Sequence, residues 1–297
     1  MAELQKKATR ESYGEALRDL ADKYPELVVL DADLAAATKT GIFKKAYPER
    51  FFDCGIAEAN MMGIAAGLTI GGKIPFTGTF AEFSTARVYD QIRQSIAYSN
   101  KNVKIAASHA GLTLGEDGAT HHGVFDLAYM RPIPNLVIAS PMNEHYLRNL
   151  MFTGYKYDGP FVIRYPRGKG VLVDWKNEMT LMPVGKGRKL TDGTDVAILS
   201  IGASGNDVSK AIELVSAEGL SVAHYDMIYL KPIDEDLLHE VGKNFSKIIT
   251  VENGVIQGGL GSAVLEFMSD NGYYPRIKRI GIPDKFIEHG SVPELNK

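Results

Sequence analysis

Residues 103–123 read VKIAASHAGLTLGEDGATHHG and join a short apolar run to a glycine-rich polar loop. The run over 103–109 is short and apolar, which is typical of a buried strand. The loop carries five chemically active side chains among four glycines: His109, Glu116, Asp117, His121 and His122. Backbone freedom beside such side chains suits a site that binds hydroxyls and moves protons. A plain surface loop with incidental histidines is the alternative interpretation.

Strand-like and helix-like segments alternate on both sides of this stretch. Short β-rich runs occupy residues 27–33 (LVVLDAD), 74–80 (IPFTGTF), 136–141 (LVIASP) and 161–166 (FVIRYP). Helical patterns lie between them, at residues 9–23, 57–70, 83–99 and 143–156. This order predicts a parallel sheet with helices on both faces. Ligands gather beyond the carboxyl ends of such strands, where Asp31, Asp33, His109 and Arg164 fall.

A second alternating region follows a break in the pattern. Residues 167–194 are rich in Gly, Lys and polar side chains and have no sustained period. Beyond them, strand-like runs at 195–202, 221–227, 247–253 and 276–282 alternate with helical patterns near 204–218, 234–243 and 258–271. We therefore predict an α/β protein of two domains, each a mainly parallel sheet flanked by helices. The expected boundaries are 1–175 for the first domain, 176–193 for the linker and 194–297 for the second.

The composition favours small-molecule chemistry. The chain has 297 residues, a formal net charge of -3 and a single cysteine, Cys54. The sequence has no basic stripe of the kind that binds nucleic acid or an anionic membrane, so we expect neither as a partner. No apolar run approaches the length of a membrane span, the first residues lack a signal-peptide core, and Cys54 has no partner for an internal disulfide. These features lead us to expect a cytoplasmic protein.

Two glycine and histidine patterns carry little functional weight. Gly258, Gly259 and Gly261 follow a strand-like run and open a helical one. Their spacing matches neither G-x-G-x-x-G nor a P-loop, so close helix packing is the favoured interpretation. His121 and His122 lie near acidic residues, but no H-E-x-x-H or spaced Cys/His set is present. We therefore predict no metal site within this chain.

Glu58 begins an otherwise apolar helical pattern rich in small residues. It can complement the positive end of the helix dipole. It can also be a partly desolvated carboxyl group that donates or shares a proton with a ligand. Phe80 and Phe83 follow a predicted strand, where core packing is the usual role of aromatic side chains.

The motifs in combination resemble one enzyme family. IAEANMMGIAAGL, IPFTGTFAEF, SHAGLTLGEDGATHHG and IRYPRG occur in this order, and together they are similar to the pyrimidine-binding and C-terminal domains of transketolase and its thiamine diphosphate-dependent relatives. The resemblance covers essentially the whole chain. Family members also need a pyrophosphate-binding domain with a GDG motif and an Asn-containing Mg²⁺ site, which this chain lacks; its GEDG at 115–118 belongs to the loop. The resemblance thus implies the C-terminal subunit of a split transketolase.

The resemblance also implies roles for eight residues. Glu58 would hydrogen-bond N1′ of the aminopyrimidine of thiamine diphosphate, and Phe80 and Phe83 would contact the same ring. Asp117 and His121 would hold sugar hydroxyls, with His121 also placed for proton transfer. Arg10, His109 and Arg164 would lie near the sugar chain and its phosphate. The implied reaction transfers a two-carbon ketol unit from a ketose, expected to be a sugar phosphate, to an aldose.

The resemblance further implies a partner. An N-terminal transketolase subunit would carry the pyrophosphate-binding domain and hold Mg²⁺ or another divalent ion, and two copies of each chain are expected. One departure concerns the phosphate site: many transketolases have a serine where this chain has Ala35, Ala36 and Ala37.

Three other readings stay open. TGYKYDGPFVIRYPRG and IPDKFIEHGS also resemble 1-deoxyxylulose-5-phosphate synthase, which condenses pyruvate with glyceraldehyde 3-phosphate. His109 and Phe83 favour transketolase, because that synthase usually has an acidic residue and an arginine there. Pyruvate dehydrogenase-type beta subunits share the architecture but lack the GEDGATHHG loop. A non-catalytic scaffolding paralogue would have no need for Glu58, Phe80, Asp117 and His121 together.

Overall fold

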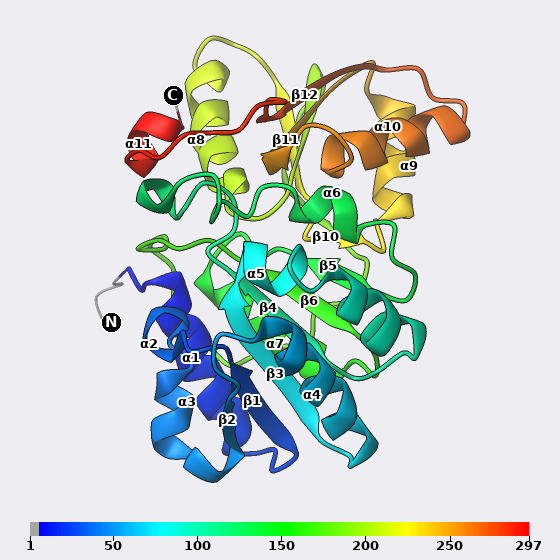
Figure 1. Ribbon diagram of the computed structural model, residues 1–297. Helices are drawn as coiled ribbons and strands as arrows, with labels where there is room; N and C mark the ends of the chain where they lie inside the picture. The colour runs from blue at the N-terminus through cyan, green and yellow to red at the C-terminus, as the bar shows by residue number, and fades with distance from the viewer. Residues whose placement is uncertain (1–5, 297) are drawn as a thin grey trace.

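The structure, a computed structural model, describes residues 6–296 and contains two sheets. In Figure 1 the second sheet lies above the first, with helix α6 and the loop before it between the two. The predicted fold class, two α/β domains with mainly parallel sheets flanked by helices, is confirmed.

The first sheet has seven strands in the order β10-β5-β6-β4-β3-β1-β2, and all neighbours are parallel except β10 and β5. Its strands are β1 (Leu27–Asp31), β2 (Phe51–Asp53), β3 (Ile74–Phe80), β4 (Lys104–Ser108), β5 (Val137–Ala139), β6 (Phe161–Arg164) and β10 (Tyr229–Lys231). Its helices are α1 (Thr9–Ala21), α2 (Ala35–Thr38), α3 (Gly41–Ala46), η1 (Pro48–Arg50), α4 (Glu58–Ile70), α5 (Ala81–Thr85), the π-helix η2 (Gln91–Tyr98), η3 (Gly115–Asp117), α6 (Asp126–Met130) and α7 (Glu144–Lys156).

Helices cover both faces of this sheet, which is why its strands read as continuous apolar runs. Leu27 and Val29 of β1 share a core with α1 and α7, whereas Val28 and Leu30 share the opposite core with α4 and η2. Successive side chains of a strand point to opposite faces, so a strand buried on both sides needs apolar residues at every position.

The second sheet has five strands in the order β12-β11-β8-β9-β7, with only β7 antiparallel to its neighbour. Its strands are β7 (Arg188–Thr191), β8 (Val196–Ser200), β9 (Val222–Asp226), β11 (Lys247–Val255) and β12 (Arg276–Ile282). The accompanying helices are α8 (Ser204–Ser216), α9 (Glu235–Asn244), α10 (Leu260–Asp270) and α11 (Val292–Leu295).

Three local features differ from the sequence-based expectations. The segment 83–99 is not one helix but α5 and the π-helix η2 with a turn between them. Residues 188–191, expected to be linker, form the edge strand β7, whose side chains alternate between half-buried and exposed. The strand β10 follows β9 in the chain yet pairs with β5 of the first sheet, so the two predicted domains interlock. The two strands have four and three residues, which is too short to show a recognisable period in the sequence.

No helix within residues 6–296 is long and apolar enough to cross a membrane.

Candidate active site

The candidate site forms at the carboxyl ends of β3 and β4, which are parallel neighbours. Phe80, the last residue of β3, pairs in register with Ser108, the last residue of β4. His109 follows directly and adopts a positive φ of 59°, so its ring turns back onto Phe80, with ring centroids 4.3 Å apart. Adjacent strand ends thus bring together two residues that are 29 positions apart in the chain.

Phe83 and His121 complete an aromatic cluster around Phe80. The centroid of Phe83 lies 5.8 Å from that of Phe80 and 5.1 Å from that of His121, which meets Phe83 edge-on. His121 comes from the far end of the loop, and its Nδ1 lies 2.9 Å from the hydroxyl of Thr120. The structure therefore assembles Phe80, Phe83, His109 and His121 into one cluster.

Glu58 joins this cluster through Arg87. Glu58 is the first residue of α4 and is buried, and its Oε1 accepts a hydrogen bond of 2.7 Å from Nη1 of Arg87. The guanidinium of Arg87 lies 4.1 Å from the ring centroid of Phe83, and half of its side chain is exposed. The carboxylate therefore lies beside the aromatic cluster, both at a helix N-terminus and in an ion pair.

Arg87 is a site residue that the sequence analysis missed. It lies four positions after Phe83, the spacing at which two side chains share one face of a helical turn. This spacing from Phe83, a predicted ring-binding residue, is the feature of the sequence from which Arg87 could have been identified.

His109 is held in its neutral form. Burial is the main cause that lowers its pKa to about 3, and the guanidinium groups of Arg167 and Arg10 lower it further. Its Nδ1 lies 3.0 Å from the hydroxyl of Ser108, which itself donates to the carbonyl of Thr79. A neutral imidazole can either donate to or accept from a bound hydroxyl, according to its tautomer.

The two arginines whose charges act on His109 are not fully buried. Arg10 donates from Nη1 to the carbonyl of Ala37 at 3.1 Å, so Arg10 and the alanine segment are neighbours. Arg167, which the sequence analysis did not single out, is exposed, and its backbone N–H donates to the hydroxyl of Thr113 in the loop. This pair offers positive charge that a ligand can reach.

The loop that carries Asp117 and His121 is closed at its base. Gly111 donates from its backbone N–H to the carbonyl of Gly123 at 2.8 Å, and the two residues form an isolated antiparallel bridge. Asp117 lies in the single turn η3 and is exposed. Among residues 6–296 no side chain forms a hydrogen bond or ion pair with its carboxylate, so the group is available to a ligand.

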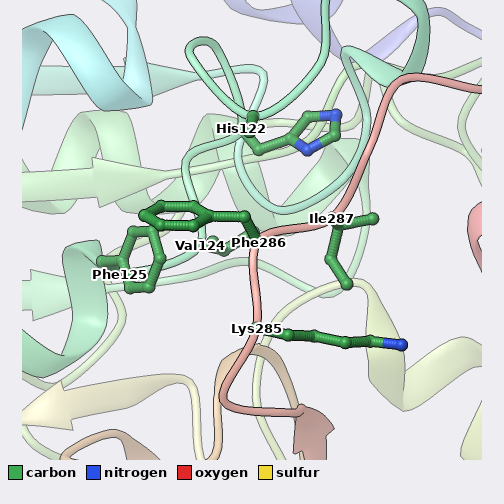
Figure 2. A pocket seen from close by; sticks show the side chains of 7 residues that line it. His122, Val124, Phe125, Lys285, Phe286 and Ile287 are labelled. Atoms are coloured by element: carbon green, nitrogen blue, oxygen red, sulfur yellow. The ribbon is translucent and has the colours of Figure 1, made fainter.

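The C-terminal segment packs over this loop. Gly290 donates to the carbonyl of Gly115 at 3.1 Å, and Phe286 meets Phe125 edge-on. Figure 2 shows the small pocket between the segment and the loop, with the buried His122 above Phe286 and Ile287. The C-terminal segment of the second domain thus covers one side of the loop and lines this pocket.

Arg164 does not lie where the resemblance implies. Its guanidinium is buried and engaged on all sides: Nε donates to Asp126 at 2.7 Å, Nη1 to the Asn253 side chain at 2.5 Å, and Nη2 to the Gly123 carbonyl at 3.0 Å. Four of its five N–H donors are used, and the side chain has almost no exposed surface for a phosphate to reach. The prediction that Arg164 contacts the sugar phosphate is therefore wrong for this structure; Arg164 ties the loop to the second domain.

Within residues 6–296, no group of three or more His, Cys, Asp or Glu side chains is arranged to hold a metal ion.

Arg164→Leu tests this structural role. Removal of the cation leaves Asp126 buried without a counter-charge, so the free energy of unfolding should fall by about 3–5 kcal/mol. Arg93→Ala, which removes the cation of an exposed pair with Asp90, should cost less than about 1 kcal/mol. Urea unfolding of both variants provides the comparison, and equal small losses would contradict the structural role.

The depressed pKa of His109 predicts acid sensitivity. The ring has an ordinary pKa of 6.5 when unfolded and about 3 when folded, so the unfolded chain binds more protons between these values. Stability is full above pH 6.5 and falls as the pH drops, by about 2 kcal/mol at pH 5 from this residue. Asparagine tolerates the positive φ at this position. Between pH 7 and pH 5 the free energy of unfolding of His109→Asn should therefore fall by about 2 kcal/mol less than that of the wild-type protein. Urea unfolding at the two pH values measures it, and identical losses would refute the assignment.

The sequence matches two family models that together span most of the chain. Residues 5–171 match the transketolase pyrimidine binding domain, and residues 185–297 match the transketolase C-terminal domain. Among curated proteins, a 1-deoxy-D-xylulose-5-phosphate synthase of Parabacteroides distasonis is 58% identical over 284 residues, which cover 95% of this chain and 45% of that protein. The chain therefore spans less than half the length of this synthase and of those of Porphyromonas gingivalis and Bacteroides thetaiotaomicron, which it also matches.

Two relatives have nearly the length of this chain. A putative transketolase C-terminal section of Methanocaldococcus jannaschii is 43% identical over 291 residues, which cover 98% of this chain and 91% of that protein. A solved structure titled as a split gene transketolase, inactive beta4 tetramer, superposes with a TM-score of 0.84 at 41% identity and covers 94% of this chain and 90% of its own. The chain belongs to the transketolase family of thiamine diphosphate-dependent enzymes and comprises the pyrimidine-binding and C-terminal domains of that family.

Proposed function

We propose that this chain takes part in carbon–carbon bond formation of the 1-deoxyxylulose-5-phosphate synthase type, in which pyruvate loses CO₂ and its remaining two carbons join glyceraldehyde 3-phosphate. The observation that carries the proposal is the 58% identity with a protein of that name, against 41–43% with the two transketolase relatives. The sequence analysis placed this reaction second, and the relatives favour it over the first choice.

Transketolase activity is the second candidate. It is favoured by His109 and Phe83, which take the place of the acidic residue and arginine usual in the synthase. The neutral His109 ring lies against Phe80 within the aromatic cluster, where an imidazole can hold a sugar hydroxyl. In this reading a two-carbon ketol unit passes from a ketose to an aldose.

The aromatic cluster suits the pyrimidine of thiamine diphosphate, which both candidates need. Phe80 and Phe83 offer ring faces and edges to a planar heteroaromatic ring, and Glu58 offers a buried carboxyl group beside them. When bound, thiamine diphosphate supplies a carbon nucleophile that attacks the donor's carbonyl. Glu58 would hydrogen-bond the pyrimidine, and for that the hydrogen bond from Arg87 must be shared or released.

The substrate would be held by the loop and by the arginines beside His109. Asp117 is exposed and His121 faces the aromatic cluster, so both are free to bind hydroxyl groups, and His121 can also move a proton. Arg10, as the resemblance implies, and Arg167, in the role first expected of Arg164, would hold a phosphate; the charges of both act on His109.

The pyrophosphate-binding half would come from another chain. The two relatives of similar length, one titled as split, support this arrangement. The exposed face of α4 is a suitable contact surface: Ile64 and Ile70 are 39% and 77% exposed, and a Cβ added at Gly63 or Gly67 would meet nothing within 4 Å. We infer that this N-terminal subunit also holds Mg²⁺ or another divalent ion, and that two copies of each chain assemble about a twofold axis.

A donor screen separates the two candidate reactions. The chain is purified together with its pyrophosphate-binding partner and supplied with thiamine diphosphate and Mg²⁺. Pyruvate with glyceraldehyde 3-phosphate should be consumed with release of CO₂, whereas xylulose 5-phosphate with an aldose should react slowly. The reverse preference would establish transketolase activity. The chain alone should be inactive, and robust turnover by it would refute the requirement for a partner.

Glu58→Gln should lower turnover of this complex by about 10²-fold or more, since an amide fills the volume but has no carboxyl proton to share. The unfolding temperature serves as the control and should change little. Full activity with unchanged stability would show that Glu58 only complements the helix dipole and takes no part in turnover.

Arg167→Ala tests the phosphate contact. Loss of one charge-assisted contact should raise the KM for glyceraldehyde 3-phosphate about tenfold or more and leave the KM for unphosphorylated glyceraldehyde nearly unchanged. Because Arg167 is exposed, folding should not suffer. An equal rise for both acceptors would show that Arg167 does not recognise the phosphate.

A further inference from the structure

Glu82 is a half-buried acidic residue that neither candidate reaction uses. It is the second residue of α5. In the sequence it stands between Phe80 and Phe83, whose rings are the proposed contacts of the pyrimidine. Its Oε2 is buried and has no hydrogen-bond partner among residues 6–296. A buried carboxyl oxygen without a partner is costly, so its surroundings require an explanation.

Asp126 has a matching orphaned oxygen. It is the first residue of α6, directly after the loop, and its Oδ2 accepts the hydrogen bond from Arg164. Its Oδ1 is buried and also lacks a partner within the described part of the chain. One oxygen of Asp126 is thus neutralised by a cation while the other is free.

The two short helices that carry these groups lie against each other. One turn beyond Glu82 and Asp126, the hydroxyl groups of Thr85 and Tyr129 are hydrogen-bonded to each other. At the start of the contact, a Cβ added at Gly123 would lie 2.7 Å from Cβ of Ala81 and 3.3 Å from the backbone nitrogen of Glu82. Glu82 of α5 therefore lies on the side of its helix that faces Asp126 of α6, one turn before Thr85 and Tyr129.

Burial and the charge of Asp126 favour the neutral form of the Glu82 carboxyl group. Burial is the largest cause that raises the pKa of Glu82 to about 7, the charge of Asp126 raises it further, and Arg87 lowers it. Arg87 is engaged by Glu58 of α4, while Arg164 of β6 lies on the other oxygen of Asp126. Tyr129 of α6 also lies nearby; burial is the main cause that raises its pKa, and the charges of Asp126 and Glu82 raise it further.

We infer that Glu82 is a positioning residue, which as a neutral carboxyl group donates a hydrogen bond to Oδ1 of Asp126 and so fixes the end of the loop against the Phe80–Phe83 cluster. The bond extends a chain of contacts. Asp126 holds Arg164, and Arg164 holds the carbonyl of Gly123 and the side chain of Asn253 in the second domain. Loss of the Glu82 proton would place two like charges together and loosen the loop that carries Asp117 and His121.

Hydrogen exchange of the loop, residues 111–123, tests this inference on the full chain without cofactor, donor or partner, so its outcome is independent of the proposed reaction. About 90% of Glu82 is neutral at pH 6 and about 10% at pH 8. After correction for intrinsic rates, protection of the loop should fall several-fold over this range. Glu82→Gln keeps a donor for Asp126 but cannot ionise, so its protection should stay constant. Glu116→Gln, an exposed carboxyl in the same loop, should follow the wild-type protein.

Infrared spectroscopy reports the proton directly. The wild-type protein at pH 6 should show a protonated carboxyl band that is absent from Glu82→Gln, and the difference should vanish by pH 8. The inference is overturned if wild-type loop protection is the same at pH 6 and pH 8, which needs no variant. It is equally overturned if Glu82→Gln follows the wild-type pH profile, or if the two infrared spectra at pH 6 coincide.

Discussion

The buried ion pair between Arg164 and Asp126 is the contact on which the arrangement of the site depends. Arg164 ends a central strand of the first sheet, Asp126 begins the helix after the loop, and Asn253 lies on a strand of the second sheet. Removal of a guanidinium from water costs several kcal/mol unless every donor finds an acceptor. The donors of Arg164 find theirs only when both sheets and the loop adopt this arrangement, so the pair makes the three segments interdependent.

The site next to this pair is preorganised by backbone rather than by side chains alone. The parallel register of β3 and β4 places Phe80 beside Ser108, and the positive φ of His109 turns its imidazole onto the phenylalanine ring. The bridge between Gly111 and Gly123 then returns the loop so that His121 reaches Phe83. Rigid strand ends hold ligand-binding groups more exactly than a free loop could.

Polar groups in this region fall into two classes, which the tertiary structure separates by burial. Arg164 and Asp126 are buried and satisfy each other, and they hold the loop in place. Arg10, Arg167 and Asp117 keep exposed surface and stay available to a ligand. Residue type does not distinguish the classes, because an arginine serves in each; what differs is whether the surrounding backbone carbonyls and carboxylates use all of its donors.

The sequence by itself determined the two α/β domains, because strands buried on both faces require continuous apolar runs and amphipathic helices require a period near 3.6 residues. It also carried the ordered motifs by which Glu58, Phe80, Phe83, His109 and His121 were selected, and these five lie in one cluster. Only the tertiary structure decided that Arg164 is a buried clamp, that Arg87 engages Glu58, and that β10 joins the first sheet. These outcomes depend on which groups meet across long separations in the chain, and the free energy of burying a charge or pairing an edge strand is set by those neighbours rather than by local sequence.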